Sequence, residues 1–290
     1  MTKEEPVSSS RASRVLNLPR SQLYYHSKRD DSEVIIKLQE LADKYPSKGL
    51  DTYFKLIQRQ GLRWGRMRVL RVYRLMKLGM RRKGKRRLPA RVKEPLKSGE
   101  TINTQWAMDF MSDALSNGRR IRILNIMDEC SREALAVYAD YSIPSVVVTQ
   151  QLEMLEKERG LPEVIRVDNG PEYTSQEFAE WCQKKAIRIH YIQPGRPMQN
   201  AFMERFNKTF RQDVLDAYLV DSIEEINQLA EQWMWTYNHE LPHGSLNNMT
   251  PNEYAQAVNS GKLATHKPNT EFTTINSHNS SSPFLKNSLV

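Results

Sequence analysis

The chain of 290 residues has few cysteines and no long apolar run. Its two cysteines, Cys130 and Cys182, stand far apart in the sequence, which excludes a disulfide framework and a cysteine-based zinc site. No uncharged apolar stretch is long enough to span a membrane, and the first 30 residues lack the apolar core of a signal peptide. We therefore expect a reducing, cytoplasmic setting and no membrane partner.

Acidic residues are absent from one long segment. Residues 52–93 contain 16 Lys and Arg and no Asp or Glu. The rest of the chain then carries 43 − 16 = 27 basic and 34 acidic residues, a formal charge of −7, against +9 for the whole chain. This concentration predicts a polyanion-binding module joined to a chemically different domain. The alternative is a solvated charge run that serves solubility alone, which the helical spacing and aromatics of the segment disfavour.

Helical patterns fill this part of the chain. Residues 9–25 fit two short helices around a turn at 17–19, a helix-turn-helix pattern that many small helical hairpins share. Residues 53–60 and 66–78 predict two further helices, which Gly61 and Gly79 would stop. In the second of these, apolar residues recur at helical spacing, namely at Val69, Val72, Tyr73 and Met76.

We predict that residues 1–93 form a small basic helical domain that binds DNA. Its cations would contact backbone phosphates, which gives affinity and salt dependence and not base reading. The predicted contact residues are Arg68, Arg71, Arg74, Arg81, Arg82, Lys83, Lys85, Arg86 and Arg87.

After a predicted linker at residues 94–104, the period of the sequence changes from helical to strand-like. Residues 105–261 predict an α/β core, a mixed five-stranded sheet flanked by helices. Its strands are predicted at 106–111, 120–127, 133–138, 164–167 and 187–192, and its helices at 145–159, 175–185, 198–218 and 223–237. Residues 262–290 are rich in Asn, Ser and Thr and predict a disordered tail.

Three carboxylates in this core have settings that suit metal-dependent chemistry. Asp109 interrupts an apolar strand, Asp168 ends another and opens an Asn-Gly-Pro turn, and Glu204 lies early in an amphipathic helix. Oxygen ligands brought together in this way can hold Mg²⁺ or Mn²⁺. Each also has a structural interpretation. Asp109 could pair with Arg122 or face solvent, Asp168 could stabilise its turn, and Glu204 could form a surface pair with Lys208.

The helix around Glu204 has two distinct faces. Apolar residues recur every fourth position and predict a buried stripe of Phe202, Phe206, Phe210 and Val214. A neighbouring polar face carries Asn200, Glu204, Lys208 and Arg211. A carboxylate flanked by cations suits a metal ion beside a phosphate backbone, so we predict that Lys208 and Arg211 contact DNA.

Four stretches carry a family resemblance: residues 106–115, 167–173, 193–207 and 237–246, the last followed by 250–254. From about residue 62 to 254 the chain resembles the second-frame transposases of bacterial insertion sequences of the IS-three type, whose catalytic domain is similar to retroviral integrases. The chain departs from the family pattern at Leu241, where Arg is usual, and at residues 47–53, which replace a Tyr-Gly-rich segment. It also lacks the His-His-Cys-Cys zinc site of retroviral integrases.

The resemblance implies a ribonuclease-H-like fold in which Asp109, Asp168 and Glu204 form an Asp-Asp-Glu triad for two Mg²⁺ or Mn²⁺ ions. It also implies supporting roles for Asn169, Gly170, Gln199 and Asn200. The implied activity is metal-dependent cleavage and strand transfer at insertion-sequence ends. The implied partners are double-stranded DNA, an upstream-frame protein or fusion, and further copies of the chain, associated with the nucleoid when bound. A ribonuclease-H-like nuclease that does not join DNA, or a non-enzymatic DNA-binding regulator, is the alternative.

Overall fold

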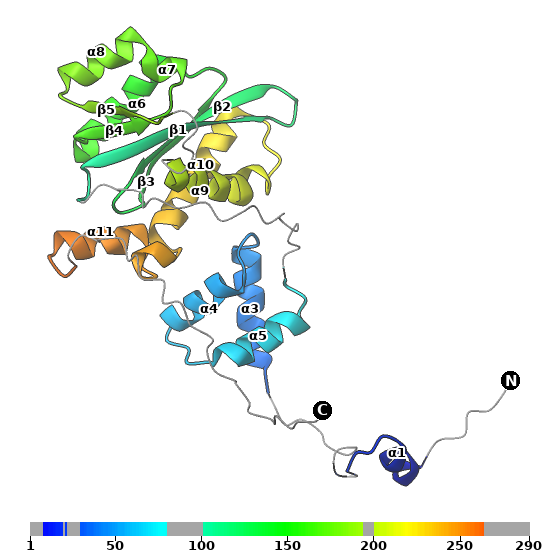
Figure 1. Cartoon of the computed structure of the whole chain (residues 1–290). Helices are drawn as coiled ribbons and strands as arrows, with labels where there is room; N and C mark the ends of the chain where they lie inside the picture. The colour runs from blue at the N-terminus through cyan, green and yellow to red at the C-terminus, as the bar shows by residue number, and fades with distance from the viewer. Residues whose placement is uncertain (1–7, 20, 22–29, 80–100, 194–199, 264–290) are drawn as a thin grey trace, which may run out of the picture. The chain divides into compact units, whose positions relative to one another are not determined.

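The computed structural model describes residues 8–19, 21, 30–79, 101–193 and 200–263 (Figure 1). The chain divides into two compact units, Met1–Lys83 and Gly84–Val290. Residues 94–100 of the predicted linker and 264–290 of the predicted tail lie outside the described ranges. Within those ranges, no helix combines the length and the apolar character needed to cross a membrane.

The first unit is helical, with α1 (Ser9–Val15), α3 (Ser32–Lys44), α4 (Leu50–Arg59) and α5 (Arg66–Leu75). The predicted turn after α1 is present, with Asn17 at φ 51°, whereas residues 22–29 of the second predicted helix lie outside the described ranges. Helix α3 was not predicted. It buries Val34, Leu38 and Leu41, an apolar spacing that its many charged residues hide in the sequence.

Helix α5 ends at Leu75, earlier than the predicted Leu78. Lys77 takes a left-handed conformation at φ 56°, which stops the helix before Gly79. The hydroxyl of Tyr73 donates to the carbonyl of Leu78 at 2.7 Å and fixes the chain beyond this point. Val69, Val72 and Tyr73 are buried as predicted, while Met76 lies past the end of the helix and is only half-buried.

The second unit is built on one five-stranded sheet. Its strands are β1 (Gln105–Ala114), β2 (Arg120–Asp128), β3 (Ala134–Asp140), β4 (Val164–Val167) and β5 (Arg188–Tyr191), in the order β3-β2-β1-β4-β5. The first three strands are antiparallel, and β4 and β5 continue the sheet in parallel from β1. All five predicted strands are present, and this mixed topology confirms the ribonuclease-H-like fold.

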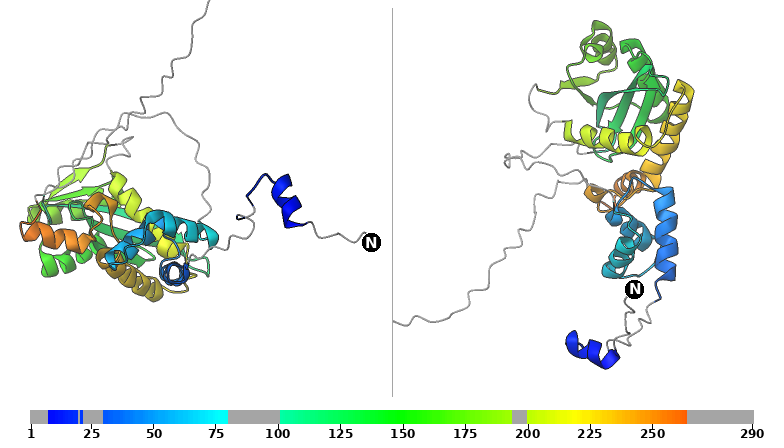
Figure 2. Two further views of the ribbon diagram at one scale, coloured as in Figure 1. Left: turned by 90° about the horizontal axis from the view of Figure 1, so that it is seen from below. Right: turned by 90° about the vertical axis from the view of Figure 1, so that its right-hand side faces the viewer.

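Helices cover both faces of the sheet (Figures 1 and 2). One face packs against α6 (Ser145–Arg159), α7 (Pro171–Thr174) and α8 (Gln176–Lys184). The other packs against α9 (Ala201–Phe210), its π-helical extension η2 (Arg211–Leu215) and α10 (Ile223–His239). The chain then continues through η3 (Gly244–Leu246) to α11 (Pro251–Asn259). Because β1 and β2 are buried on both sides, most of their residues are apolar.

A buried ion pair joins β4 to the end of β2. Arg166 of β4 is 5% exposed, and its guanidinium donates to the carboxylate of Glu129 at 2.8 Å. Glu129 is 1% exposed and also accepts from the side chain of Gln105 at 3.0 Å. This pair accounts for an arginine in the middle of a buried four-residue strand, and it fixes the strand that leads to Asp168.

Arg166→Met is expected to lower the free energy of unfolding by about 3 kcal/mol, because it leaves the carboxylate of Glu129 buried without its cation. The double variant Glu129→Met with Arg166→Met should recover much of this loss, since neither side chain then carries a charge that must be desolvated. Urea unfolding followed by tryptophan fluorescence measures both. A double variant no more stable than Arg166→Met would contradict this account.

Candidate active site

Two of the three candidate carboxylates lie on neighbouring parallel strands. β1 and β4 pair with Ala107 opposite Arg166. Asp109 lies two residues beyond Ala107, and Asp168, the first residue after β4, lies two residues beyond Arg166. The register therefore brings these two carboxylates to adjacent positions on the same side of the sheet. They lie at the carboxyl end of β4, where open α/β sheets bind ligands.

Hydrogen bonds hold the carboxylate of Asp109 from two directions. One oxygen accepts from the backbone NH of Phe110 at 2.9 Å, and the other accepts from the side-chain amide of Asn207 at 2.7 Å. The carbonyl oxygen of Asn207 in turn accepts from the amide of Asn125 at 2.7 Å. Asn125 is fully buried opposite Asp109 in β2. Asn207 thus joins helix α9 to both central strands.

Glu204 comes from this same helix, one turn before Asn207. Phe206 and Phe210 anchor α9 on the sheet, where their rings meet Trp233 of α10 edge-on at 5.3 and 5.0 Å. Phe202, the first member of the predicted stripe, is half-buried under the guanidinium of Arg132. The apolar face of the helix is therefore turned to the core, and Glu204 lies exposed outside that face.

The three carboxylates share one electrostatic neighbourhood. Burial raises the pKa of Asp109 to about 6, and the negative charges of Asp168 and Glu204 add to this effect. The hydrogen bonds from Phe110 and Asn207 oppose it. A divalent cation would relieve this repulsion, and carboxylate oxygens are the ligands that Mg²⁺ and Mn²⁺ prefer, so Asp109 and Asp168 fit such an ion by their chemistry.

Glu204 does not complete a tight metal-binding group with the two aspartates. Among the described residues, no three His, Cys, Asp or Glu side chains lie close enough together to hold a metal ion. Repulsion between ionised carboxylates opposes a closer approach. Glu204 instead faces a shallow hollow of about 480 Å³ along α9, lined by Ala201, Glu204, Arg205, Lys208, Thr209 and Gln212. The described part of the chain shows no ion pair between Glu204 and Lys208.

The arginine that could have neutralised Asp109 is engaged elsewhere. Arg122 forms an ion pair with Glu172 and lies 4.2 Å from the centre of the Phe110 ring. Burial raises the pKa of Glu172, but the hydrogen bond from Arg122, a backbone hydrogen bond and the charge of Arg122 together outweigh burial and leave that pKa below its ordinary value. Arg122 therefore does not pair with Asp109, and the charges that act on Asp109 are those of Asp168 and Glu204.

Asp113 and Asp128, two further carboxylates near the site, have structural partners. Asp113 pairs with Arg211 at 2.7 Å, and Asp128 accepts from the backbone NH of Asn103, just before β1, and from two NH groups in the turn between β2 and β3. Arg211 also donates to the carbonyl of Ser112 at 2.9 Å. The predicted DNA contact Arg211 thus ties the π-helical end of α9 to β1.

The predicted supporting residues have different surroundings. Asn169 donates to the carbonyl of Ile192 at 3.0 Å and so ties the turn after β4 to the end of β5. The NH of Gly170 donates to Asp168 at 2.9 Å, and a Cβ at Gly170 would lie 3.0 Å from the same oxygen, which explains the glycine. Asn200 precedes α9 without a side-chain cap, and Gln199 lies outside the described ranges.

The sequence interpretation missed Asn125 and Asn207. Asn125 interrupts the apolar run of β2, and a buried amide in such a place needs a hydrogen-bond partner. Asn207 follows Glu204 by three residues and therefore lies on the same side of the helix. Both signals are present in the sequence, but neither identifies Asp109 as the group that the two amides hold.

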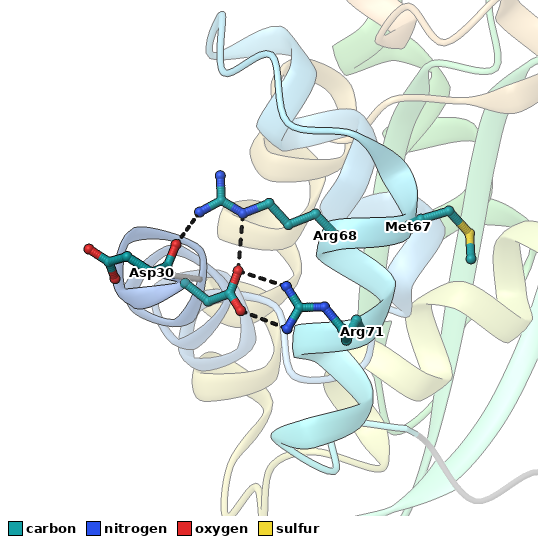
Figure 3. A pocket seen from close by; sticks show the side chains of 5 residues that line it. Asp30, Met67, Arg68 and Arg71 are labelled. Carbon is teal, nitrogen blue, oxygen red and sulfur yellow. Dashed lines mark hydrogen bonds and ion pairs between the residues drawn. The ribbon is translucent and has the colours of Figure 1, made fainter. Parts of the chain in front are cut away.

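In the helical unit, two of the predicted DNA-contacting arginines have an acidic partner. Arg68 and Arg71 both bind the carboxylate of Asp31, at 3.1 and 2.7 Å (Figure 3). With Asp30 and Met67 these residues line a hollow of about 560 Å³. Arg74 of the same helix is exposed and has no such contact in the described part of the chain. The predicted contacts from Arg81 to Arg87 lie outside the described ranges.

The chain has clear relatives. Two family models, both described as integrase core domain, match residues 100–197 and 185–251. The chain is 34% identical over 251 residues to the insertion element IS407 uncharacterized 31.7 kDa protein of Burkholderia multivorans, covering 86% of this chain and 91% of the relative. It is 26% identical over 276 residues to the transposase InsD for insertion element IS2D of Escherichia coli, covering 84% and 90%.

Among solved structures, the HTLV-2 integrase catalytic core domain in complex with magnesium is similar, with 20% identity and a TM-score of 0.43 over 54% of this chain and 99% of that chain. The sequence matches define the class: a protein with an integrase core. The alignment with the first relative covers 91% of that protein at 34% identity. The chain therefore belongs to the family of insertion-element transposases.

Asp109→Asn is expected to stabilise the protein at neutral pH in buffer without divalent cations. Folding raises the pKa of Asp109 to about 6, so the folded protein holds this proton more tightly than the unfolded chain. The wild type therefore loses stability as the pH rises from about 4 to 6, and the variant does not. Urea unfolding should show a gain of about 1 to 2 kcal/mol at pH 7.5 that closes toward pH 4. A gain in stability that does not change with pH would contradict a raised pKa at Asp109.

Proposed function

We propose that this protein is a transposase that cleaves DNA at the ends of an insertion sequence and joins the released strands to target DNA by metal-dependent phosphoryl transfer. The adjacency of Asp109 and Asp168, with the charge of Glu204 acting on the same carboxylate, is the observation that carries the proposal. Membership in the transposase family supports it.

Asp109 would contribute oxygens to two ion sites, and Asp168 and Glu204 would each contribute to one. When bound, Mg²⁺ or Mn²⁺ ions supply activation of the attacking oxygen and stabilisation of the leaving oxygen at phosphorus. Neighbouring groups of the protein orient the carboxylates that would bind the ions. Asn207 orients the carboxylate of Asp109, and the NH of Gly170 orients that of Asp168. Closure of the site requires Glu204 to approach the two aspartates.

The two units would have different roles in binding DNA. The acid-free segment at residues 52–93 would supply phosphate contacts and salt-dependent affinity for double-stranded DNA, through Arg74 and the basic residues that follow it. Lys208 and Arg205 would meet phosphates beside Glu204. Pairing of two element ends calls for more than one copy of the chain. An upstream-frame protein and a cytoplasmic, nucleoid-associated location belong to the same proposal.

Asp109→Asn, Asp168→Asn and Glu204→Gln should each lower cleavage of end-sequence DNA by more than about a hundredfold. Loss of a residue that only orients a ligand commonly costs ten- to a hundredfold, and loss of the ligand itself costs more. Binding of the same DNA should be nearly unchanged, because these residues are not the source of affinity. Gel analysis of cleaved and joined products with Mg²⁺ measures the first effect, and fluorescence anisotropy measures the second.

Asp113→Asn serves as the matched control, because Asp113 is a nearby carboxylate with a structural partner. It should retain most of the cleavage activity. Full activity in any of the three triad variants would remove that residue from the site. Cleavage without joined products in the wild type would favour a nuclease over a transposase.

Arg74→Gln should reduce the slope of log affinity against log salt concentration by about 1, as expected when one phosphate contact is lost. Arg68→Gln should reduce it less, because Asp31 already neutralises that guanidinium. Anisotropy titrations of duplex DNA over a salt series compare the two variants. Equal changes in slope would show that the Asp31 pair does not withhold Arg68 from DNA.

A further inference from the structure

Two arginines of α5 hold one carboxylate between them. Asp31 accepts from Nε of Arg68 at 3.1 Å, and its two oxygens accept from the two terminal nitrogens of Arg71 at 2.7 and 2.9 Å (Figure 3). A terminal nitrogen of Arg68 also donates to the backbone carbonyl of Asp30. A guanidinium presents the same planar fork of N–H donors to the paired oxygens of a carboxylate and of a phosphate. The two arginines therefore form an anion-binding site, and Asp31 occupies it.

Asp31 is not needed to cap or to hold α3. It is the N-cap residue of this helix, where an aspartate ordinarily accepts from the first NH groups, yet its side chain makes no such hydrogen bond. Apolar side chains hold α3 instead, where it packs on α4 and α5. The ion pairs add little to stability, since the side chains of Arg68 and Arg71 are 37% and 42% exposed. Release of Asp31 from the arginines therefore leaves the helical unit folded.

This anion-binding site lies in line with the cation that we assign to DNA. Arg68, Arg71 and Arg74 recur every third residue of α5 and so follow one another along the helix surface. The hollow beside Arg68 and Arg71 measures about 560 Å³ and has the exposed Met67 in its lining, so a phosphate can reach the guanidiniums. Residues 52–93 carry no acid of their own, and the acid on these two arginines comes from outside that segment. A DNA strand that contacts Arg74 thus passes beside two further cations.

Resting on the DNA binding proposed above, we propose that Arg68 and Arg71 form a binding site for a phosphate of the DNA backbone, and that Asp31 closes this site in the free protein. The phosphodiester takes the place of the carboxylate, so the guanidiniums exchange one anion for another. Contact with the phosphate releases counterions from the DNA, but Asp31 must first separate from the arginines. Asp31 thereby limits how tightly the helical unit binds DNA, and it acts on a phosphate contact and not on the fold.

Asp31→Asn in the full chain tests this competition, because it removes the charge and keeps the size of the side chain. The variant should bind a labelled duplex of mixed sequence about tenfold more tightly at roughly 0.1 M salt, and its slope of log affinity against log salt concentration should steepen by about 1, as expected when one phosphate contact is gained. Fluorescence anisotropy over a salt series measures both. A purely structural role for Asp31 predicts an affinity that stays equal or falls with the melting temperature, and that result overturns the inference.

Asp30→Asn is the matched control. It removes the same charge from the adjacent residue, whose carboxylate accepts from the backbone NH of Ser32 at 2.9 Å and not from Arg68 or Arg71. Its DNA affinity should rise by less than about threefold and its salt slope should stay that of the wild type, because no guanidinium is released. Equal gains in the Asp30 and Asp31 variants would show a general effect of charge and would overturn the site.

Arg68→Gln combined with Arg71→Gln separates release of the arginines from every other effect of Asp31→Asn. This pair of changes should lower DNA affinity little where Asp31 is present, and it should cancel the gain of Asp31→Asn when all three changes are combined. A gain that persists without the two arginines overturns the inference. Absence of salt-dependent duplex binding by the wild type overturns the proposed function instead.

The wild type itself offers a second measurement. A crystal structure of the full chain with duplex DNA should show a phosphate oxygen within hydrogen-bond distance of a guanidinium nitrogen of Arg68 or Arg71, with the carboxylate of Asp31 withdrawn from that nitrogen. Bound DNA beside an Asp31 that still pairs with both arginines would overturn the site. That outcome would leave the DNA-binding role of the helical unit intact.

Discussion

The parallel pairing of β1 with β4 is the constraint on which the candidate site depends. Three residue pairs fix the register, and this register alone places Asp109 beside Asp168 although 58 residues separate them in the chain. The buried pair of Arg166 and Glu129 and the buried faces of both strands hold that register. Helix α9 packs on the sheet through its apolar residues, and its Asn207 also donates a hydrogen bond to Asp109 itself.

The same arrangement explains why charge is tolerated at the centre of a buried sheet. Asp109 receives two hydrogen bonds, yet its pKa is raised to about 6 because burial and two neighbouring carboxylates outweigh them. Arg122, the cation that could have neutralised it, pairs with Glu172. The protein therefore keeps a concentration of negative charge in the middle of the sheet, where β4 ends beside β1, and a divalent cation is the species that such a site attracts.

Much of this fold could be predicted from the sequence, because strand alternation and helical spacing are local properties. All five strands were predicted, and both ends of β4 and α6 fall where expected. Long-range partners could not be predicted. The link from Asn125 through Asn207 to Asp109 joins residues 82 and 98 positions apart. The binding of Asp31 to Arg68 and Arg71 depends on α3, a helix whose charged residues conceal its apolar stripe. Strand register and the choice of side-chain partners are set by tertiary packing, and the periodicity of apolar residues in the sequence carries no information on that packing.

The central claim is that folding gathers Asp109, Asp168 and Glu204 around shared cations, although Glu204 is exposed on α9. A crystal structure of the protein with Mn²⁺ and end-sequence DNA, phased on the anomalous signal of the metal, tests this claim most directly. The account predicts anomalous peaks that contact Asp109 together with Asp168, and Asp109 together with Glu204. Peaks elsewhere, or a Glu204 carboxylate that stays turned away from bound metal, would contradict it.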